Sequence, residues 1–262
     1  MTNLFLIPFL AGLPLALALP RLGQLLRMRD EGLAALGLAH LASATALAGQ
    51  AAHLPGVLGA PLGALLGGAA KALLGARGNG AFALMILAGW CATLLIASNS
   101  ALGEALAHAH IEGQLYFAGV AELIAALSVS LAMLLALPWL TPRLVRARLF
   151  PLHETANRMP AWRWHLGFDL LAALAIAIAT ATLGLMAAFA LVFVPPWIAH
   201  RRARNWRHAS RLAAGIGLTA YVLAFATALA FDQPFGPLLV LVLLSLLGLS
   251  AIPVGLQSRP NP

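Results

Sequence analysis

Two ionisable side chains lie within long apolar segments of the sequence, where they are candidates for metal binding. His40 lies about nine residues into the apolar segment 32–53, and Glu122 about eight residues into the segment 115–140. Ionisable groups at such positions are costly in a bilayer and mark functional sites by default. Imidazole nitrogen and carboxylate oxygen both bind zinc and other transition metals. If the two segments border one cavity, His40 and Glu122 would form a weak, transient metal site.

The same residues also fit other roles. His40 could instead be a neutral histidine that forms a hydrogen bond to a neighbouring helix. His40 and Glu122 together could also be a proton or ion relay in a secondary transporter that works without ATP. Asp169 lies close to the beginning of the segment 166–183, where it would face water or pair with an arginine of the preceding loop.

A polar stretch at 99–114 offers a second group of potential ligands. His108, His110 and Glu112 lie within five residues, and Glu104 precedes them. They fit either an outer vestibule that attracts a divalent cation or an ordinary solvated loop. The single cysteine lies inside an apolar segment, so neither a disulfide framework nor a cysteine metal site is expected.

The elements that must position these residues are membrane-spanning helices. The chain is 61% apolar and only 9% charged, whereas soluble domains have about 25% charged residues. Several apolar segments approach the roughly 20 residues that a transmembrane helix needs. We therefore predict one all-α polytopic transmembrane domain over residues 1–262, with about eight or nine transmembrane helices. The expected segments are 4–19, 32–53, 54–74, 81–98, 115–140, 166–183, 185–199, 212–231 and 237–252.

Charge placement predicts the orientation of these helices. All sixteen lysines and arginines fall in the alternate connections 20–31, 71–80, 141–165 and 200–211 and in the C-terminal tail. The positive-inside rule places these connections in the cytoplasm, with the N-terminus outside and the C-terminus cytoplasmic. The net charge of +8 then reflects cytoplasmic loops rather than nucleic-acid binding. No Walker A, GxSG or HExxH pattern is present, which argues against ATP binding by that route and against a membrane enzyme.

Four stretches of the sequence carry a family resemblance by their order and spacing: Leu22-Gly23 through Arg27-Met28-Arg29 to His40, Leu115-Tyr116-Phe117-Ala118-Gly119, Leu183-Gly184-Leu185 through Val194-Pro195 to Arg201-Arg202, and Phe231-Asp232-Gln233-Pro234-Phe235-Gly236-Pro237. They resemble the membrane subunits of bacterial ABC importers for zinc, manganese and iron. The resemblance implies a transport subunit of the bacterial inner membrane, with zinc as the first candidate substrate. It also implies a homodimer in the lipid bilayer, a cytoplasmic ATP-binding subunit that hydrolyses ATP, and an extracytoplasmic solute-binding protein. No cofactor and no enzymatic activity are expected of this chain.

The sequence departs from the family pattern where a metal ligand is expected. The family has an aspartate one helical turn before the histidine, and this chain has Leu36 there. The change removes a hard oxygen ligand next to His40. Either another group, such as Glu122, replaces it, or the substrate is held more weakly or is not a bare cation.

Two proline-containing segments are expected to move. Pro151 and Pro160 bracket a short helix within the basic connection 141–165. In the family such a coupling helix docks on the ATPase, and here it would use Pro151, Leu152, His153, Glu154 and Met159; the alternative is a basic loop without a partner. Pro195 and Pro196 are expected to break a helix and act in gating.

Overall fold

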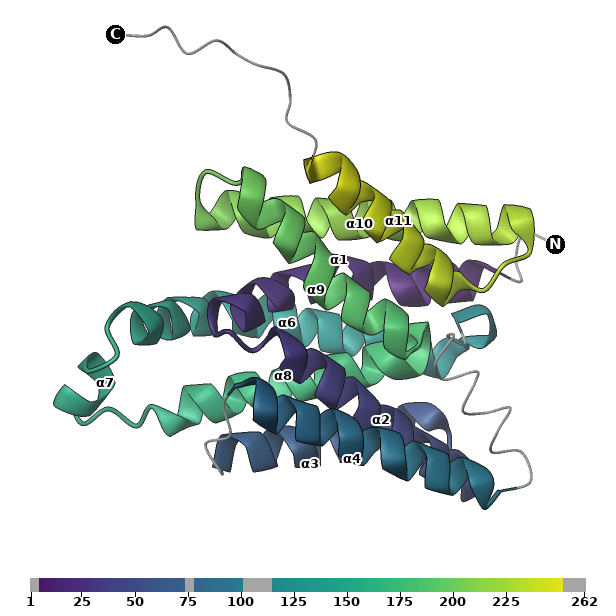
Figure 1. Ribbon diagram of the computed structural model, residues 1–262, viewed down its shortest axis with the longest axis horizontal. Coiled ribbons are helices and arrows are strands. Elements are labelled where there is room, and N and C mark those ends of the chain that lie inside the picture. Colours follow the sequence, from purple (N-terminus) through teal and green to yellow (C-terminus); the bar gives the residue numbers. More distant parts are fainter. Residues whose placement is uncertain (1–4, 74–77, 101–114, 252–262) are drawn as a thin grey trace, which may run out of the picture.

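The computed structural model is entirely helical in the part that it describes, residues 5–73, 78–100 and 115–251 (Figure 1). This confirms the predicted all-α class. The described residues form ten α-helices and one 3-10 helix, which are α1 (Leu6–Met28), α2 (Gly32–Ala51), α3 (Gly56–Leu73), α4 (Asn79–Ser98), η1 (Leu115–Phe117), α6 (Val120–Leu149), α7 (His153–Ala156), α8 (Trp162–Leu183), α9 (Leu185–Arg202), α10 (Trp206–Phe231) and α11 (Phe235–Ala251).

Nine of these helices correspond to the nine apolar segments expected from the sequence. Seven are long and apolar enough to cross a membrane, and the other two are α9, which ends on His200–Arg202, and α11, which has 17 residues. Helices α1, α3, α6 and α9 finish at one end of the bundle, and α2, α4, α8 and α10 begin there. We call this end the basic end. It contains all the lysines and arginines in the described residues.

The centre of the bundle is built from α1, α2, α8 and α9. α1 packs against α6, α8, α9 and α10, and α2 packs against α3, α4, α8 and α9. Most of α8 is buried, whereas little of α4 and α6 is buried, and these two helices carry leucine and tryptophan side chains outward. Such apolar outer faces fit contact with lipid or with a second subunit.

Proline and glycine allow two of the central crossings to be unusually close. Pro20 cannot donate a backbone hydrogen bond to Ala16, and the freed Ala16 carbonyl faces Gly217 of α10, where a β-carbon would lie 2.7 Å from it. Pro196 likewise cannot donate to Val192. A β-carbon at Gly23 of α1 would lie only 1.9 Å from the Val192 carbonyl oxygen, so any larger residue there would separate α1 from α9.

The prediction that Pro195 and Pro196 break a helix is wrong. α9 is a continuous helix from Leu185 to Arg202 and contains both prolines. Two consecutive prolines remove only two donors from the helix, and packing against α1 covers the carbonyl of Val192 that Pro196 frees.

The basic connection predicted for 141–165 is shorter than expected. α6 continues as helix to Leu149, and α8 begins at Trp162, so only residues 150–161 connect them. Pro138 and Pro142 are both accommodated inside α6. In Figure 1 the ends of α6 and α8 extend beyond the other helices, and α7 lies at the tip of this hairpin.

Candidate functional site

The short helix α7 is held against α8 by one carboxylate. Glu154 accepts a hydrogen bond from Trp164 Nε1 at 2.8 Å, and its other oxygen lies 3.1 Å from His165 Nε2. Trp164 is buried, whereas the turn that contains α7 is mostly exposed. Glu154 therefore faces the protein and fixes α7 relative to the beginning of α8.

The outer face of the α7 turn presents apolar side chains. Leu152 is 77% exposed and Met159 is 38% exposed. α7 spans only His153–Ala156, shorter than the Pro151–Met159 helix expected, because Arg158 adopts a left-handed conformation (φ 48°). The Met159 amide then donates to the Glu154 carbonyl and ends the helix.

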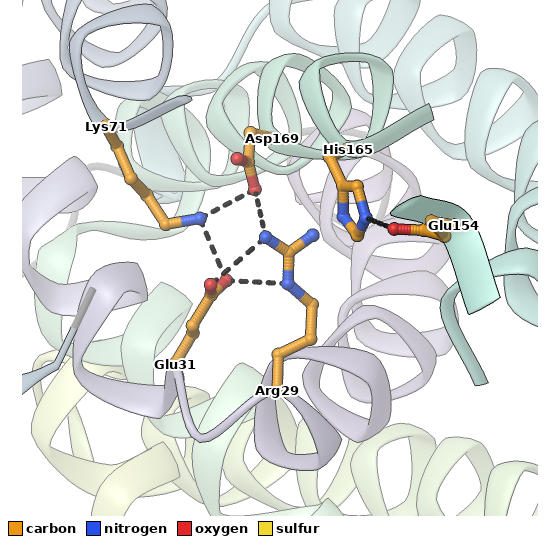
Figure 2. Close-up of polar contacts among 6 residues, drawn as sticks. All are labelled: Arg29, Glu31, Lys71, Glu154, His165 and Asp169. Carbon is orange, nitrogen blue, oxygen red and sulfur yellow. Dashed lines mark hydrogen bonds and ion pairs between the residues drawn. The ribbon is translucent and has the colours of Figure 1, made fainter. Parts of the chain in front are cut away.

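A buried cluster of four charges lies further along α8 (Figure 2). Lys71 Nζ lies 2.8 Å from Glu31 Oε2 and 2.7 Å from Asp169 Oδ1. Arg29 Nε lies 3.0 Å from Glu31 Oε2, and Arg29 Nη2 lies 3.3 Å from Asp169 Oδ1. The side chains are 4 to 12% exposed, so the two cations and two anions neutralise one another within the protein. The cluster joins α8 to the end of α3 and to the α1–α2 connection.

The two groups of contacts share one face of α8. His165, which holds α7, and Asp169, which holds the charge cluster, are four residues apart and therefore lie one above the other on a helix. Figure 2 shows both side chains on α8, with Glu154 on one side and Lys71 and Arg29 on the other. A displacement of α7 would thus reach α1, α2 and α3 through a single helix.

Asp169 was expected to face water or to pair with an arginine of the preceding loop. It is instead buried and pairs with Lys71 and Arg29, which are distant in sequence. Glu31 and Lys71 were not singled out from the sequence. The sequence did contain an indication of this ion pair. Glu31 and Lys71 are opposite charges at the ends of apolar segments, and both are predicted to lie on the cytoplasmic side, so they were candidates to pair.

His40 and Glu122 make their contacts on different helices. His40 is buried between α2 and α4, with its ring centroid 5.4 Å from that of Trp90, and a β-carbon at Gly89 would lie 2.7 Å from its own. Glu122 lies in the first turn of α6 and accepts a hydrogen bond at 2.8 Å from the Gly119 amide. These contacts do not bring the two side chains together as a metal site.

The other candidate ligands do not form a metal site in the described part of the chain. His108, His110 and Glu112 lie outside the described residues. Within the described residues, no three histidine, cysteine, aspartate or glutamate side chains form a group that could hold a metal ion.

A cavity of about 660 Å³ opens at the basic end between α1, α2, α4 and α9. Its lining combines the polar side chains Asp30, Asn79 and His200 with the aromatic rings Phe193 and Trp197. The Arg27 guanidinium carbon lies 4.4 Å from the centroid of the Trp197 ring at this cavity. The cavity therefore brings charged, polar and aromatic side chains together at the basic end.

The first and third of the four family-like stretches meet at the basic end. Gly23 of the first stretch contacts Val192 of the third, and Arg27 of the first covers Trp197, which lies within the third. The bulky Trp197 ring thus forms a cation–π contact with the Arg27 guanidinium.

The second and fourth stretches meet at the opposite end. The Tyr116 hydroxyl donates to the Gln233 carbonyl at 3.4 Å, and the Tyr116 ring lies 6.0 Å from that of Phe225, which in turn packs on Phe235. These separated stretches therefore define helix contacts at the two ends of the bundle.

Comparisons with known proteins agree with this arrangement. A model of the ABC 3 transport family matches residues 1–253. No curated protein matches the chain. Among solved structures, PsaBC from Streptococcus pneumoniae in complex with Fab is similar with a TM-score of 0.81 and 18% identity, over 95% of this chain and 91% of that chain. A structure described as an inward-facing conformation of a metal-chelate type ABC transporter is similar with a TM-score of 0.67 and 15% identity, over 93% of this chain and 83% of that chain. At these identities the two structures show a shared helical architecture.

Proposed function

The chain belongs to the ABC 3 transport family, and from this premise we propose that it is the membrane subunit of an ATP-driven importer for a divalent transition metal. Zinc is the first candidate substrate, with manganese and iron as alternatives. Family membership and seven apolar helices make it a multi-pass protein of the bacterial inner membrane. ATP hydrolysis belongs to a partner subunit, and a solute-binding protein delivers the substrate to a homodimer of this chain.

The observation that carries the proposal is the family match over residues 1–253. Two further points support a metal as the substrate. The stretch from Leu22 to His40 resembles the corresponding segment of zinc, manganese and iron importers, and one of the similar solved structures is described as metal-chelate type.

The proposed mechanism uses the α6–α7–α8 hairpin to transmit movement. Leu152 and Met159, on the exposed face of α7, would dock on the ATPase, with Pro151 and His153 beside them. Glu154 would hold α7 rigidly on α8, through Trp164 and His165. When the ATPases close, α8 would move with α7 and shift the charge cluster at the basic end.

The proposed substrate path involves His40 and its neighbours. His40 would contact the substrate from its position beside Trp90, and the outer residues His108, His110 and Glu112 would attract cations to the entrance. Glu122 is placed less favourably for this role because its carboxylate caps α6.

The test is uptake of labelled zinc, manganese and iron by cells that lack this chain and express either the wild type or a variant. We expect His40→Ala to reduce uptake of one metal by at least about tenfold, the loss associated with an essential polar contact worth roughly 1.4 kcal/mol. Glu122→Ala should have a smaller effect, and comparable membrane levels serve as the control. Unchanged uptake of all three metals without the chain would refute the metal proposal.

A secondary transporter would behave differently in one respect. Purified chain reconstituted in vesicles with a proton gradient, but without an ATPase, would then accumulate metal. We expect no accumulation until the ATP-binding subunit and ATP are added.

A further inference from the structure

A second cavity, of about 520 Å³, lies at the basic end between α1, α6 and α10. Three arginines line it: Arg21 from α1 and Arg207 and Arg211 from α10. None of the three forms an ion pair within the described part of the chain. Three unpaired cations around one cavity create a strong attraction for an anionic group.

The remainder of the cavity wall is mostly apolar and mostly follows α6, with hydroxyl groups at Ser130, Thr141 and Ser210. It includes Met133, Leu134 and Leu137, while Trp206 lies beside the arginines. Along α6 the wall extends from Pro142 to Ser130, which is about 18 Å of helix. Half of a typical hydrocarbon core is about 15 Å. The cavity therefore extends through about one leaflet, with its positive charges at the polar surface.

From this combination we infer that the cavity between α1, α6 and α10 binds an anionic phospholipid of the inner leaflet. The phosphate would lie between Arg21, Arg207 and Arg211, where guanidinium groups can donate paired hydrogen bonds to phosphate oxygens. The acyl chains would lie along Leu134 and Leu137. Trp206 would lie at the interface between headgroup and chains, a position that tryptophan favours.

The geometry favours a lipid over a soluble anion. Arginines alone would suffice for free phosphate, but an apolar wall that continues for a leaflet's depth has a use only if the ligand carries long apolar chains. Basic pockets between transmembrane helices on the cytoplasmic side bind anionic headgroups in this manner. The inference does not depend on the transported substrate.

The test is lipid binding by the full chain purified in neutral detergent. Phosphatidylglycerol and phosphatidylcholine of identical chain length are titrated separately and bound lipid is counted by native mass spectrometry. The cavity variant carries Arg21→Gln, Arg207→Gln and Arg211→Gln. A matched variant carries Arg146→Gln, Arg158→Gln and Arg204→Gln, which removes the same charge from exposed positions that do not line the cavity.

We expect wild type and the matched variant to prefer phosphatidylglycerol over phosphatidylcholine. The cavity variant should bind phosphatidylglycerol at least about tenfold more weakly, since each basic residue near an anionic surface contributes about fivefold in affinity. Leu134→Trp fills the apolar wall from an exposed position without changing charge, and it should weaken binding as well.

Three results would overturn the inference. One is equal affinity for the two lipids. Another is an equal loss in the cavity and matched variants, which would indicate general attraction to a basic surface. The third is displacement of phosphatidylglycerol by the same concentration of inorganic phosphate, which would indicate a site for the phosphate group alone.

Discussion

Lys71 illustrates how strongly a single charge can determine the conformation of the basic end. It is the lysine of the four-charge cluster and is 6% exposed. Its ammonium group contacts carboxylates from two other parts of the chain, Glu31 and Asp169. Without it, two buried carboxylates would share the single positive charge of Arg29.

We therefore predict that Lys71→Met destabilises the protein. The expected cost is about 3 kcal/mol, typical of breaking a buried ion pair, which corresponds to a fall in Tm of roughly 6 to 12 °C for a chain of this size. Thermal unfolding of the detergent-purified protein measures it. Arg146→Met, which removes an exposed arginine, is the control and should leave Tm nearly unchanged.

The double variant Lys71→Met with Asp169→Asn separates charge balance from packing. It leaves Arg29 and Glu31 as a balanced pair, so it should be more stable than Lys71→Met alone. If the double variant is less stable than the single variant, the cluster is not held together by charge compensation.

At the residue scale, the sequence indicates which groups are unusual but not what they contact. His40 and Asp169 stand out because ionisable groups are rare in apolar segments. The contact of His40 with Trp90 depends on Gly89, because the absence of a side chain at Gly89 lets α4 approach α2 closely. The partners of Asp169 come from segments about 100 and 140 residues away, and only the packing of α8 against α3 and α1 brings them together.

At the scale of elements, the α7 hairpin divides its residues between two roles. Leu152 and Met159 are exposed and available to a partner, whereas Glu154 is directed toward α8. Substitutions of the two kinds should therefore have different consequences for coupling and for structure.

We predict that Leu152→Ser with Met159→Ser reduces assembly with the ATP-binding subunit at least about tenfold, because two exposed apolar contacts at roughly 1 kcal/mol each are lost. Co-purification of the two subunits measures this. Glu154→Gln should retain assembly, because the exposed face is unchanged, but transport per ATP hydrolysed should fall. Equal effects of the two variants on assembly would contradict this division of roles.

The proline pair of α9 can be tested at the same scale. Pro195→Ala with Pro196→Ala restores two backbone donors within a helix that is already continuous. If the freed carbonyls give α9 the flexibility that gating needs, the variant should be more thermostable and slower in metal uptake. Unchanged uptake would exclude a gating role for these prolines.

The ends of helices were predictable from apolar segments where small or uncharged residues follow the apolar part, and not where arginines follow it. α2 and α4 begin and end within two residues of their predicted segments. α1 and α6 continue nine residues past theirs, to Met28 and Leu149. Arginine has a high helix propensity, so a helix that leaves the apolar region does not have to end there.

For the whole molecule, the predicted orientation can be tested independently of transport. In a Cys91→Ser background, Gln233→Cys and His153→Cys report the two ends of the bundle. We expect a membrane-impermeant maleimide to label position 233 in intact cells and position 153 only after permeabilisation, because the positive-inside rule places the basic end in the cytoplasm. The opposite pattern would show an inverted topology.

The number of helices, their alternation and the separation of charge to one end were all accessible from the sequence, since each follows from hydropathy and charge alone. The order in which helices surround α1 was not, because it depends on contacts such as that between Gly23 and the Val192 carbonyl. In the proposed homodimer, a substrate site shared between the subunits would depend on surfaces beyond one chain.

The length of α6 has a consequence for the range of membranes in which the protein can work. Its 30 residues form a helix of about 45 Å, compared with a hydrocarbon thickness of about 30 Å. The excess lies at the basic end, where α6 carries arginines rather than apolar side chains. A bilayer a few ångströms thicker or thinner would therefore cover more or less of this excess without displacing α7 from the aqueous phase. Transport should accordingly tolerate changes in lipid chain length that would disturb a protein whose coupling segment lay at the membrane surface.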